Sequence, residues 1–450
     1  MEGTARTRPR TGLVATCNGH VLWAVGILAV CAYVAIHVMP PEGNPVVSDG
    51  FSYYVYLPSW VIYGDPTLED VANRRFGGTF PGWSGLTRWP GTERWVNPHQ
   101  MGVAVLLLPF YLAGHALTFI WRYPSDGWSF FYRHAAGLGG AFYLVAGLFF
   151  LRRLLNRHFP PGIALATIVT ITFGTNLFHY ATFDALWSHV YSFSLIACLL
   201  DLIDGWERGP SRRSAFGIGI VIGLIALVRP ANLSVLLFLP LFGVVDRASL
   251  RARPAVLLVR APQIALMALA AGLVFAPQMA LYKSATGAFL VDPYRSLLTI
   301  QGVRAFDFLH PHLAGVLVGV RKGLFFWSPA LLLSVAGFFT MREPLRAFRL
   351  PSVAVIAVNT MLVASWWDWQ FGGSYGHRAF TDLLAMFALP VAALYARAAG
   401  RPAPRAAVTV FACLAVSLSI VQMGQYWLGI IPYSDVTWEQ YQSFFLRLRR

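Results

Sequence analysis

Long apolar runs alternate along the chain with short polar segments that carry arginines. The first run, from Val21 to Met39, has about the 20 residues that a helix needs to cross the hydrocarbon core of a bilayer. Further apolar runs follow, and none is interrupted by a stretch long and polar enough to form a soluble domain. The pattern predicts an all-α, polytopic bundle of transmembrane helices.

Composition agrees with this prediction. The chain is 56% hydrophobic and 12% charged, whereas soluble domains carry about 25% charged residues. The net charge is +15, but the basic residues form short clusters between apolar runs, as the positive-inside rule produces. We therefore expect membrane lipids as partners and no nucleic acid. The predominance of Arg over Lys indicates a GC-rich genome, and hence the cytoplasmic membrane of a bacterium.

The run from Met101 to Trp121 decides the topology. If it crosses the membrane, Arg152, Arg153 and Arg157 lie outside, against the charge bias. If it rests in the interface, five basic clusters fall on the cytoplasmic side. This second arrangement predicts about eleven spans, at 21–39, 133–151, 162–179, 185–203, 216–228, 235–245, 264–281, 324–340, 353–366, 380–395 and 406–421. The short pair around Pro230 could instead be a re-entrant hairpin, which leaves the parity unchanged.

The same topology divides the chain into a cytoplasmic tail (1–20), one membrane domain (21–425) and an external C-terminal tail (426–450). Arg6, Arg8 and Arg10 place the N-terminus in the cytoplasm, whereas Arg447, Arg449 and Arg450 would lie outside, against the rule. Three segments of the membrane domain are expected to be external loops: 40–132, 282–323 and 367–379.

Asp49 is the candidate catalytic residue. It lies about ten residues past the first span, at the head-group boundary, and an aromatic run follows it at Phe51, Tyr53 and Tyr54. A carboxylate there can meet the polar head of a lipid whose tail stays in the bilayer. As a general base it would take the proton of an acceptor hydroxyl during sugar transfer. The alternative is a solvated turn residue, since Asp-Gly is a common turn dipeptide.

Several cations are candidate phosphate ligands. His377 and Arg378 follow a glycine-rich turn, which allows close approach of a ligand, and they open a helix whose N-terminus favours an anion. Arg378 can bind phosphate through two parallel hydrogen bonds, or it can be an interfacial arginine that snorkels. Arg133, Arg321 and Lys322 also lie at the outer ends of spans, where they are either phosphate ligands or ordinary interfacial cations.

Other polar and aromatic residues suggest weaker hypotheses. His99 could touch an acceptor or simply pack at a helix start, and the tryptophans around Trp367 could stack on a sugar or belong to the aromatic belt. His179, Asp184 and His189 are metal-type ligands, but their five-residue spacings do not match a helical pair. The sequence shows no nucleotide-binding glycine loop, Ser-His-Asp order or zinc signature.

Four segments resemble the polytopic GT-C glycosyltransferases, which include protein mannosyltransferases and aminoarabinose transferases. They are Asp49 after the first span; Asn97-Pro98-His99 with Leu108-Pro109-Phe110 and Gly114; Arg133 opening the second span; and Arg321 to Pro329 together with Trp366 to Arg378.

The resemblance implies inverting transfer from a polyprenyl-phosphate-linked sugar to a glycan, lipid or protein acceptor at the external face, with Asp49 as base. The arginines would hold the donor phosphate. The expected phosphate-binding residues are Arg378, His377, Arg133, Arg321 and Lys322, and the expected substrate-binding residues are Tyr53, Tyr54, His99, Trp367, Asp368 and Tyr375.

The chain also departs from that family. Asn97-Pro98-His99 replaces a Lys-Pro-Pro segment, and the periplasmic domain of larger members is missing. Some members hold a divalent cation beside paired acids, but Asp49 has no clear acidic partner, so a divalent cation is left open as a cofactor. A transporter or lipid flippase and a non-catalytic subunit of a glycan assembly machine are the alternatives. The position of the charges at the outer ends of spans favours an enzyme, because transporters place their sites near the midplane.

Overall fold

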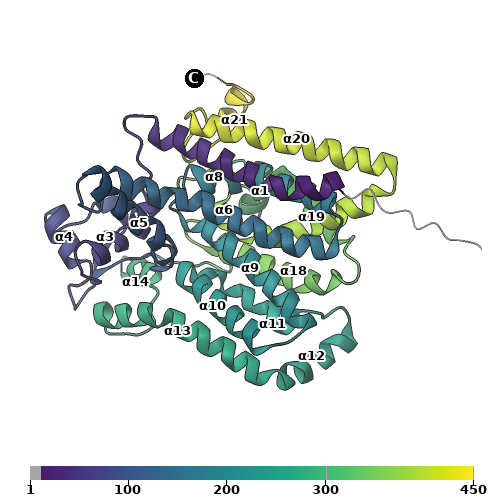
Figure 1. Ribbon diagram of the computed structural model, residues 1–450, viewed down its shortest axis with the longest axis horizontal. Helices are drawn as coiled ribbons and strands as arrows, with labels where there is room; N and C mark the ends of the chain where they lie inside the picture. Colours follow the sequence, from purple (N-terminus) through teal and green to yellow (C-terminus); the bar gives the residue numbers. More distant parts are fainter. Residues whose placement is uncertain (1–11, 301, 449–450) are drawn as a thin grey trace, which may run out of the picture.

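The computed structural model describes residues 12–300 and 302–448, and these residues form an almost wholly helical bundle (Figure 1). The expected all-α class is confirmed. Among these residues the strands are two residues long each, β1 (Thr87–Arg88) and β2 (Trp95–Val96), paired antiparallel. The longer helices of the bundle are α1 (Gly12–Tyr33), α6 (Phe130–His158), α9 (Ser188–Arg208), α10 (Arg212–Val228), α13 (Ala261–Thr286), α18 (Arg346–Ser365), α19 (Leu384–Ala399) and α20 (Pro402–Trp427).

Within the described part of the chain, 7 helices are long and apolar enough to cross a membrane, and α5 (Gly102–Trp121), which is expected in the interface, is one of them. Several of the expected spans, however, are not continuous helices. The run 162–179 divides into α7 (Pro161–Phe173) and α8 (Leu177–Thr182). The run 324–340 divides into α16 (Leu324–Trp327), the 3₁₀ turn η4 (Pro329–Leu331) and α17 (Leu332–Phe338). Pro329 explains the second break, because proline lacks the N–H that a helix interior requires.

The segment after Pro230 is also short. It forms the 3₁₀ helix η3 (Pro230–Leu237) and one turn of α-helix, α11 (Phe238–Leu241), before α12 (Arg247–Val259). Its apolar part is far shorter than the 20 or so residues of a span. This geometry favours the short re-entrant alternative over a full crossing at 235–245.

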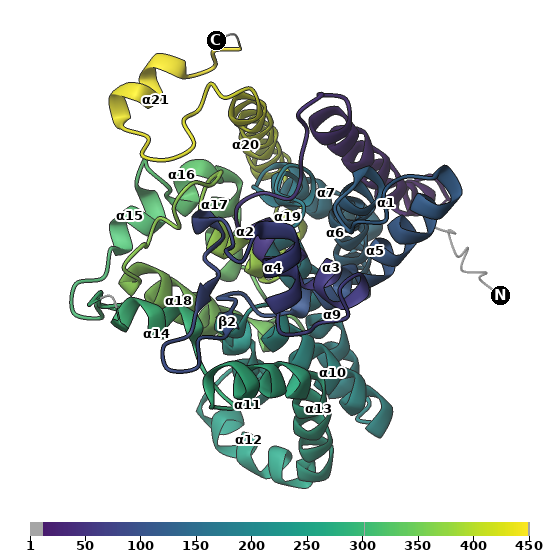
Figure 2. The same cartoon turned by 90° about the vertical axis from the view of Figure 1, so that its left-hand side faces the viewer.

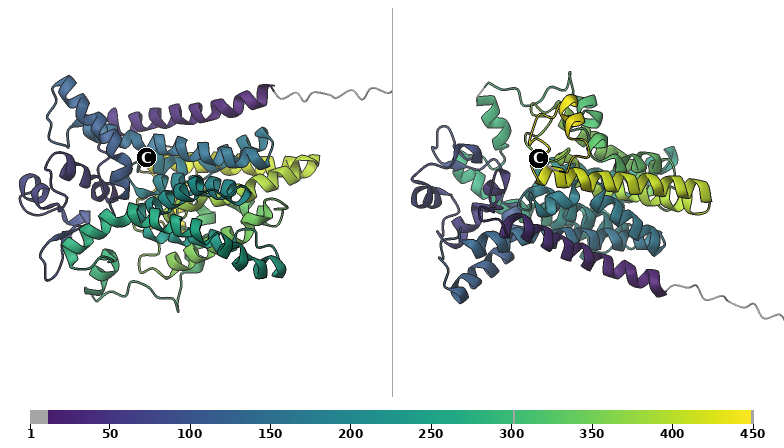
Figure 3. Two further views of the ribbon diagram at one scale, coloured as in Figure 1. Left: turned by 60° about the horizontal axis from the view of Figure 1, so that its bottom comes forward. Right: turned by 90° about the horizontal axis from the view of Figure 1, so that it is seen from above.

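The run that decides the topology forms helix α5 (Gly102–Trp121). The segment before it contacts α3 (Tyr56–Val61), since the Tyr56 hydroxyl donates to the His99 carbonyl at 2.9 Å. The segment after it contacts α2 (Asp49–Tyr54), since the Tyr54 hydroxyl donates to the Gly127 carbonyl at 2.7 Å. The chain thus enters and leaves α5 at one end of the bundle, and both panels of Figure 3 show α5 inclined to the long helices. This arrangement supports the interfacial interpretation.

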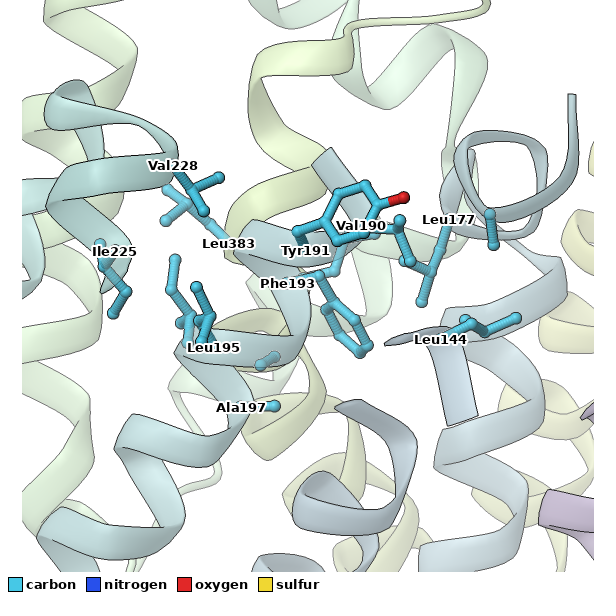
Figure 4. Close-up of a cluster of buried hydrophobic side chains, with 14 of the residues drawn as sticks. Leu144, Leu177, Val190, Tyr191, Phe193, Leu195, Ala197, Ile225, Val228 and Leu383 are labelled. Carbon is cyan, nitrogen blue, oxygen red and sulfur yellow. The ribbon is translucent and has the colours of Figure 1, made fainter. Parts of the chain in front are cut away.

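Tight contacts at glycines fix the bundle beneath that end. A Cβ on Gly147 of α6 would lie 2.7 Å from the Phe193 ring of α9, and one on Gly219 of α10 would overlap the Met267 carbonyl of α13. Figure 4 shows Phe193 among the buried side chains where α6, α9 and α10 meet. Packing at this density holds the helix ends, and thus the loops that they carry, in fixed positions.

Short helices cover the end of the bundle that carries Asp49 (Figure 2). The remaining elements are the π-helix η1 (Val34–Val38), α4 (Glu69–Phe76), η2 (Gly82–Ser84), α14 (Pro293–Ile300), α15 (Leu313–Val318), η5 (Arg378–Leu383) and α21 (Trp438–Phe444). The tails that bear Arg6, Arg8, Arg10, Arg449 and Arg450 lie outside the described residues. The expected orientation of the two ends and the division into tail, membrane domain and loops therefore stay predictions.

Candidate active site

Asp49 and Arg378 form the centre of the site. Arg378 Nη1 donates to Asp49 Oδ2 at 2.5 Å, across 329 positions of sequence. The carboxylate side chain is 28% exposed and the guanidinium side chain 14%. The first acid past the membrane and the distant cationic turn are thus in direct contact.

Local backbone geometry aims the Asp49 carboxylate. Ser48, just before it, has φ +50°, a conformation that costs a non-glycine residue energy and is typical of functional sites. Gly50, just after it, packs closely on the α8–α9 connection, where a Cβ would lie 3.1 Å from Leu186 and 3.4 Å from the Trp187 ring. Glycine at 50 therefore lets the acid reach the bundle surface beside Trp187.

Two aromatic rings hold the Arg378 guanidinium. Its Cζ lies 4.5 Å from the Trp187 ring centroid and 5.6 Å from that of Phe371. Stacking on aromatic faces stabilises an arginine and fixes the plane of its donors. The Nε of Arg378 is buried and has no hydrogen-bond partner within the described residues, so the guanidinium keeps an unused donor.

The glycine-rich turn before Arg378 has a different role from the expected one. A Cβ on Gly373 would overlap the Tyr433 ring, and one on Gly376 would lie 3.2 Å from Trp327. The Ser374 amide also donates to the Tyr433 carbonyl at 3.2 Å. These glycines admit the protein's own aromatic side chains, so the expectation that they make room for a ligand is wrong for Gly373 and Gly376.

The charge of Asp49 is stabilised by its neighbours. Burial alone would raise its pKa, but the positive charge of Arg378, with smaller contributions from His99 and His189, outweighs burial and lowers the pKa to about 2. Burial lowers the pKa of His99 despite the nearby Asp49 charge. The site at neutral pH is thus an ionised carboxylate with a neutral imidazole beside it.

A second charged cluster, the Asp382 cluster, lies behind the first. Asp382 accepts hydrogen bonds from Asn232 Nδ2 at 2.8 Å and from Arg229 at 3.2 Å, and its other oxygen lies 2.8 Å from His189 Nδ1. The Asp382 side chain is fully buried, with 0% exposure. Arg229 stacks on the same Phe371 ring as Arg378, at 5.5 Å. The sequence gave no signal for Asp382 or Phe371.

The other expected phosphate ligands point elsewhere. Lys322 is buried and donates to the backbone carbonyls of Ser374 and Tyr433, the latter at 3.3 Å. Burial, followed by the charges of Arg378 and Arg321, lowers its pKa to about 7. Arg321 forms an ion pair with Asp435. Both residues hold the C-terminal segment against the turn that precedes Arg378.

Two further candidates are not placed to act as free cations. His377 is buried, its ring lies 5.0 Å from that of Phe380, and burial lowers its pKa to about 3, so it is neutral at physiological pH. Arg133 lies in the first turn of α6 (Phe130–His158), and no contact joins it to Asp49 within the described residues. Their assignment as phosphate ligands stays a prediction with no geometric support.

Among the expected substrate-binding residues, Tyr53 and His99 lie beside Asp49. Their rings are 4.7 Å apart, and burial, followed by the Asp49 charge, raises the pKa of Tyr53. Trp367 is half exposed and Asp368 lies in the adjoining turn, near Lys322. These four remain predictions for contact with a substrate.

Tyr54 and Tyr375 have structural partners instead. Tyr54 is fully buried and donates to the Gly127 carbonyl. Tyr375 is buried and donates to the Ser419 carbonyl of α20 at 3.1 Å. Their hydroxyls are therefore occupied within the protein.

The residues do not fit a metal centre. His179 bonds to Asp184 at 2.9 Å, but His189 faces Asp382 instead. Within residues 12–300 and 302–448, no three His, Cys, Asp or Glu side chains gather as a set of metal ligands. Asp49 has a guanidinium as its partner rather than a second acid.

An apolar groove lies far from this site. A groove of about 810 Å³ is lined by apolar side chains such as Phe338, Phe339 and Val353, with Arg247 and Arg349 at its rim. Arg349 precedes the end of α18 at Ser365 by 16 residues, or about 24 Å of helix. Since the Ser365 end borders the aromatic residues near Asp49, the groove belongs to the opposite end of the bundle.

Comparison with known proteins identifies the fold. The sequence matches no protein-family model and no curated protein. The structure is similar to the archaeal oligosaccharyltransferase AglB from Archaeoglobus fulgidus, solved in complex with an inhibitory peptide and a dolichol-phosphate, with a TM-score of 0.50 and 13% identity. Two further structures of the Archaeoglobus fulgidus oligosaccharyltransferase, in the apo form and in complex with Zn and sulfate, give TM-scores of 0.48 and 0.49 at 13% and 15% identity.

The similarity extends over nearly the whole chain. It covers 97% of this protein but 60% of AglB, so the chain spans less than two thirds of that enzyme. At this identity the comparison establishes the fold alone. The protein is a polytopic membrane protein with the GT-C fold of membrane glycosyltransferases, as the sequence predicted.

Proposed function

We propose that the protein is a glycosyltransferase that moves a sugar from a polyprenyl-phosphate carrier to an acceptor hydroxyl at the external face of the membrane. The observation that carries the proposal is the contact between Asp49 and Arg378 at the loop-bearing end of a GT-C bundle. One group is a partly exposed base, and the other is a cation suited to phosphate. Both stand where a lipid head group meets water.

The chemistry follows from this pair. The acceptor oxygen attacks the anomeric carbon of the sugar, and its proton passes to the Asp49 carboxylate. The bond between the anomeric carbon and the phosphate oxygen breaks, and its electron pair leaves with the polyprenyl phosphate. Arg378 stabilises the anion that departs. Attack from the side opposite the phosphate gives inversion at the anomeric carbon.

The surroundings suit such a substrate. Tyr53 and His99 border Asp49 on the acceptor side of the pair, and Trp367 is exposed and available to stack on a sugar. The carrier chain can remain in the bilayer while its phosphate reaches Arg378. No step needs a divalent cation, for which the described side chains provide no ligand set. The sugar and the chemical class of the acceptor are left open.

The alternatives gain no support from the geometry. A subunit without catalytic activity does not require Asp49 and Arg378 to converge, yet they form a direct contact. A transporter would place its charged groups near the bilayer midplane, whereas this pair lies where α2 and the loop 366–377 meet at one end of the bundle.

The test is sugar transfer from radiolabelled polyprenyl-phosphate sugars in membranes that contain Asp49→Asn. Loss of a general base lowers the rate by about 100-fold or more, so we expect transfer to fall by at least that factor at normal protein yield. The matched control is Asp70→Asn, an exposed acid in the same loop, which should leave transfer unchanged. Wild-type turnover in the Asp49→Asn membranes would refute the assignment.

A further inference from the structure

A single hydrogen bond joins Arg378 to Asp49. The guanidinium donates from Nη1 to Asp49 Oδ2, and its buried Nε has no partner within the described residues. Arginine has five donors arranged to meet phosphate or carboxylate oxygens in pairs. The Arg378 side chain is thus engaged with an internal carboxylate while part of its donor capacity is unused.

The neighbouring pair shows what a permanent structural contact looks like in this protein. Asp382 is fully buried and has three partners, in Arg229, Asn232 and His189. Asp49 is 28% exposed. Within residues 12–300 and 302–448, Arg378 is the one group with a hydrogen bond to its carboxylate. Two Asp–Arg pairs thus share the ring of Phe371, one with a fully buried carboxylate and one with a partly exposed carboxylate.

An arriving phosphate would compete with Asp49 for this arginine. Because the Nε of Arg378 is buried, a phosphate that takes two parallel hydrogen bonds must use the Nη1–Nη2 edge of the guanidinium, where Asp49 already accepts from Nη1. Arg229 cannot replace Arg378 there without taking the arginine partner away from the buried Asp382 carboxylate, which is costly. Lys322 is likewise committed to two backbone carbonyls.

We propose that Asp49 is an internal competitor for the donor phosphate, and that donor binding transfers Arg378 from the carboxylate to the phosphate. The proposal rests on the function given above and adds an order to it. The donor binds first, Arg378 moves to its phosphate, and the released carboxylate becomes free to take the acceptor proton. Before the donor binds, the base is masked by the same arginine that later stabilises the leaving group.

The decisive experiment measures binding of polyprenyl phosphate, a probe without sugar, to the purified full-length protein in lipid nanodiscs. We expect Asp49→Asn to bind the probe about tenfold more tightly than wild type, or tighter still, because a hydrogen bond to a charged group no longer competes. Arg378→Gln should bind it at least about tenfold more weakly. In the double variant the gain from Asp49→Asn should vanish, since the competition acts through Arg378.

Two control variants distinguish the proposed competition from an effect of the substitution on folding. Asp70→Asn should bind the probe like wild type, and Asp49→Ser should repeat the Asp49→Asn result if the amide itself disturbs the site. If both Asp49 variants bind the probe no more tightly than wild type, at normal melting temperatures, the proposed competition is overturned. The glycosyltransferase function is tested separately, by the transfer assay. In the wild-type complex with the probe, cryo-EM should show Asp49 and Arg378 separated beyond hydrogen-bond distance, and an intact pair would also overturn it.

Discussion

Trp187 covers one face of the Arg378 guanidinium, with 4.5 Å between its ring centroid and Cζ. Trp187 belongs to the α8–α9 connection, on which Gly50 packs, so one side chain positions both members of the Asp49–Arg378 pair. The packing at Gly50 sets where the acid lies, and the stacking sets the plane of the cation. The geometry of the site thus depends on a residue that has no chemistry of its own in the reaction.

Replacing Trp187 should weaken binding of the donor phosphate. A cation–π contact is worth about 0.5–2 kcal/mol, so Trp187→Leu should lower the affinity for polyprenyl phosphate by about 2- to 30-fold. The control is Trp23→Leu, which changes an exposed tryptophan on the outer face of α1. Titrations of both variants in nanodiscs check this, and an unchanged affinity for Trp187→Leu would contradict the role of stacking.

The pH dependence of transfer should differ between the free enzyme and its donor complex. Asp49 acts in its deprotonated form, so activity is lost as pH falls through its pKa. That pKa is about 2 while Arg378 is paired with it, so kcat/KM should show no acid limb from Asp49 above about pH 4. Once Arg378 turns to the phosphate, the pKa rises, and the acid limb of kcat should appear at a higher pH. If the acid limbs of kcat and kcat/KM lie at the same pH, Arg378 does not move from Asp49 to the phosphate.

The two Asp–Arg pairs should respond differently to neutralisation. Asp382→Asn leaves Arg229 and its partners around an uncharged amide, and breaking a buried pair costs about 3–5 kcal/mol. We therefore expect a large fall in melting temperature and protein yield for Asp382→Asn. Asp49→Asn, in the more exposed pair, should lose transfer at near-normal stability. Equal melting temperatures for the two variants would show that the enclosed pair is not structural.

The contact between Gly373 and Tyr433 should not tolerate a side chain. A Cβ at 373 would overlap the Tyr433 ring, and overpacking typically costs about 1–3 kcal/mol. Gly373→Ala should therefore lower the melting temperature in detergent and reduce transfer, because the turn precedes Arg378. Gly424→Ala is the matched control, since nothing lies within 4 Å of its Cβ in α20. A neutral Gly373→Ala would mean that this turn adjusts freely.

The orientation in the membrane can be tested with two engineered cysteines. A Cβ added at Gly82 or at Gly209 would meet open space, and the topology places 82 outside and 209 in the cytoplasm. In a background without the native cysteines, an impermeant maleimide should label Gly82→Cys in intact cells and Gly209→Cys only after permeabilisation. If both cysteines are labelled from outside, the orientation derived from the basic clusters is refuted.

Much of the fold could be read from the sequence because a bilayer demands long apolar runs and basic clusters mark one side of it. The helix breaks at Pro329 and after Phe173 were not predicted, because the length of an apolar run does not show where a helix within it is interrupted. Asp49 could be found because its position past the first span is itself a physical constraint. Trp187, Phe371 and Asp382 could not be found in this way, because tertiary packing alone brings them to the site.

The adjacent residues Arg321 and Lys322 reach in two directions, to Asp435 and to the carbonyls of Ser374 and Tyr433. The segment around Tyr433 is thereby tied to the turn that presents Arg378. A chimera with a foreign segment at 433–435, between α20 and α21, would consequently have a displaced guanidinium even if the residues in contact with Asp49 were retained. If this site is grafted onto another scaffold, residues 321–322, 366–378 and 433–435 must therefore be transferred together.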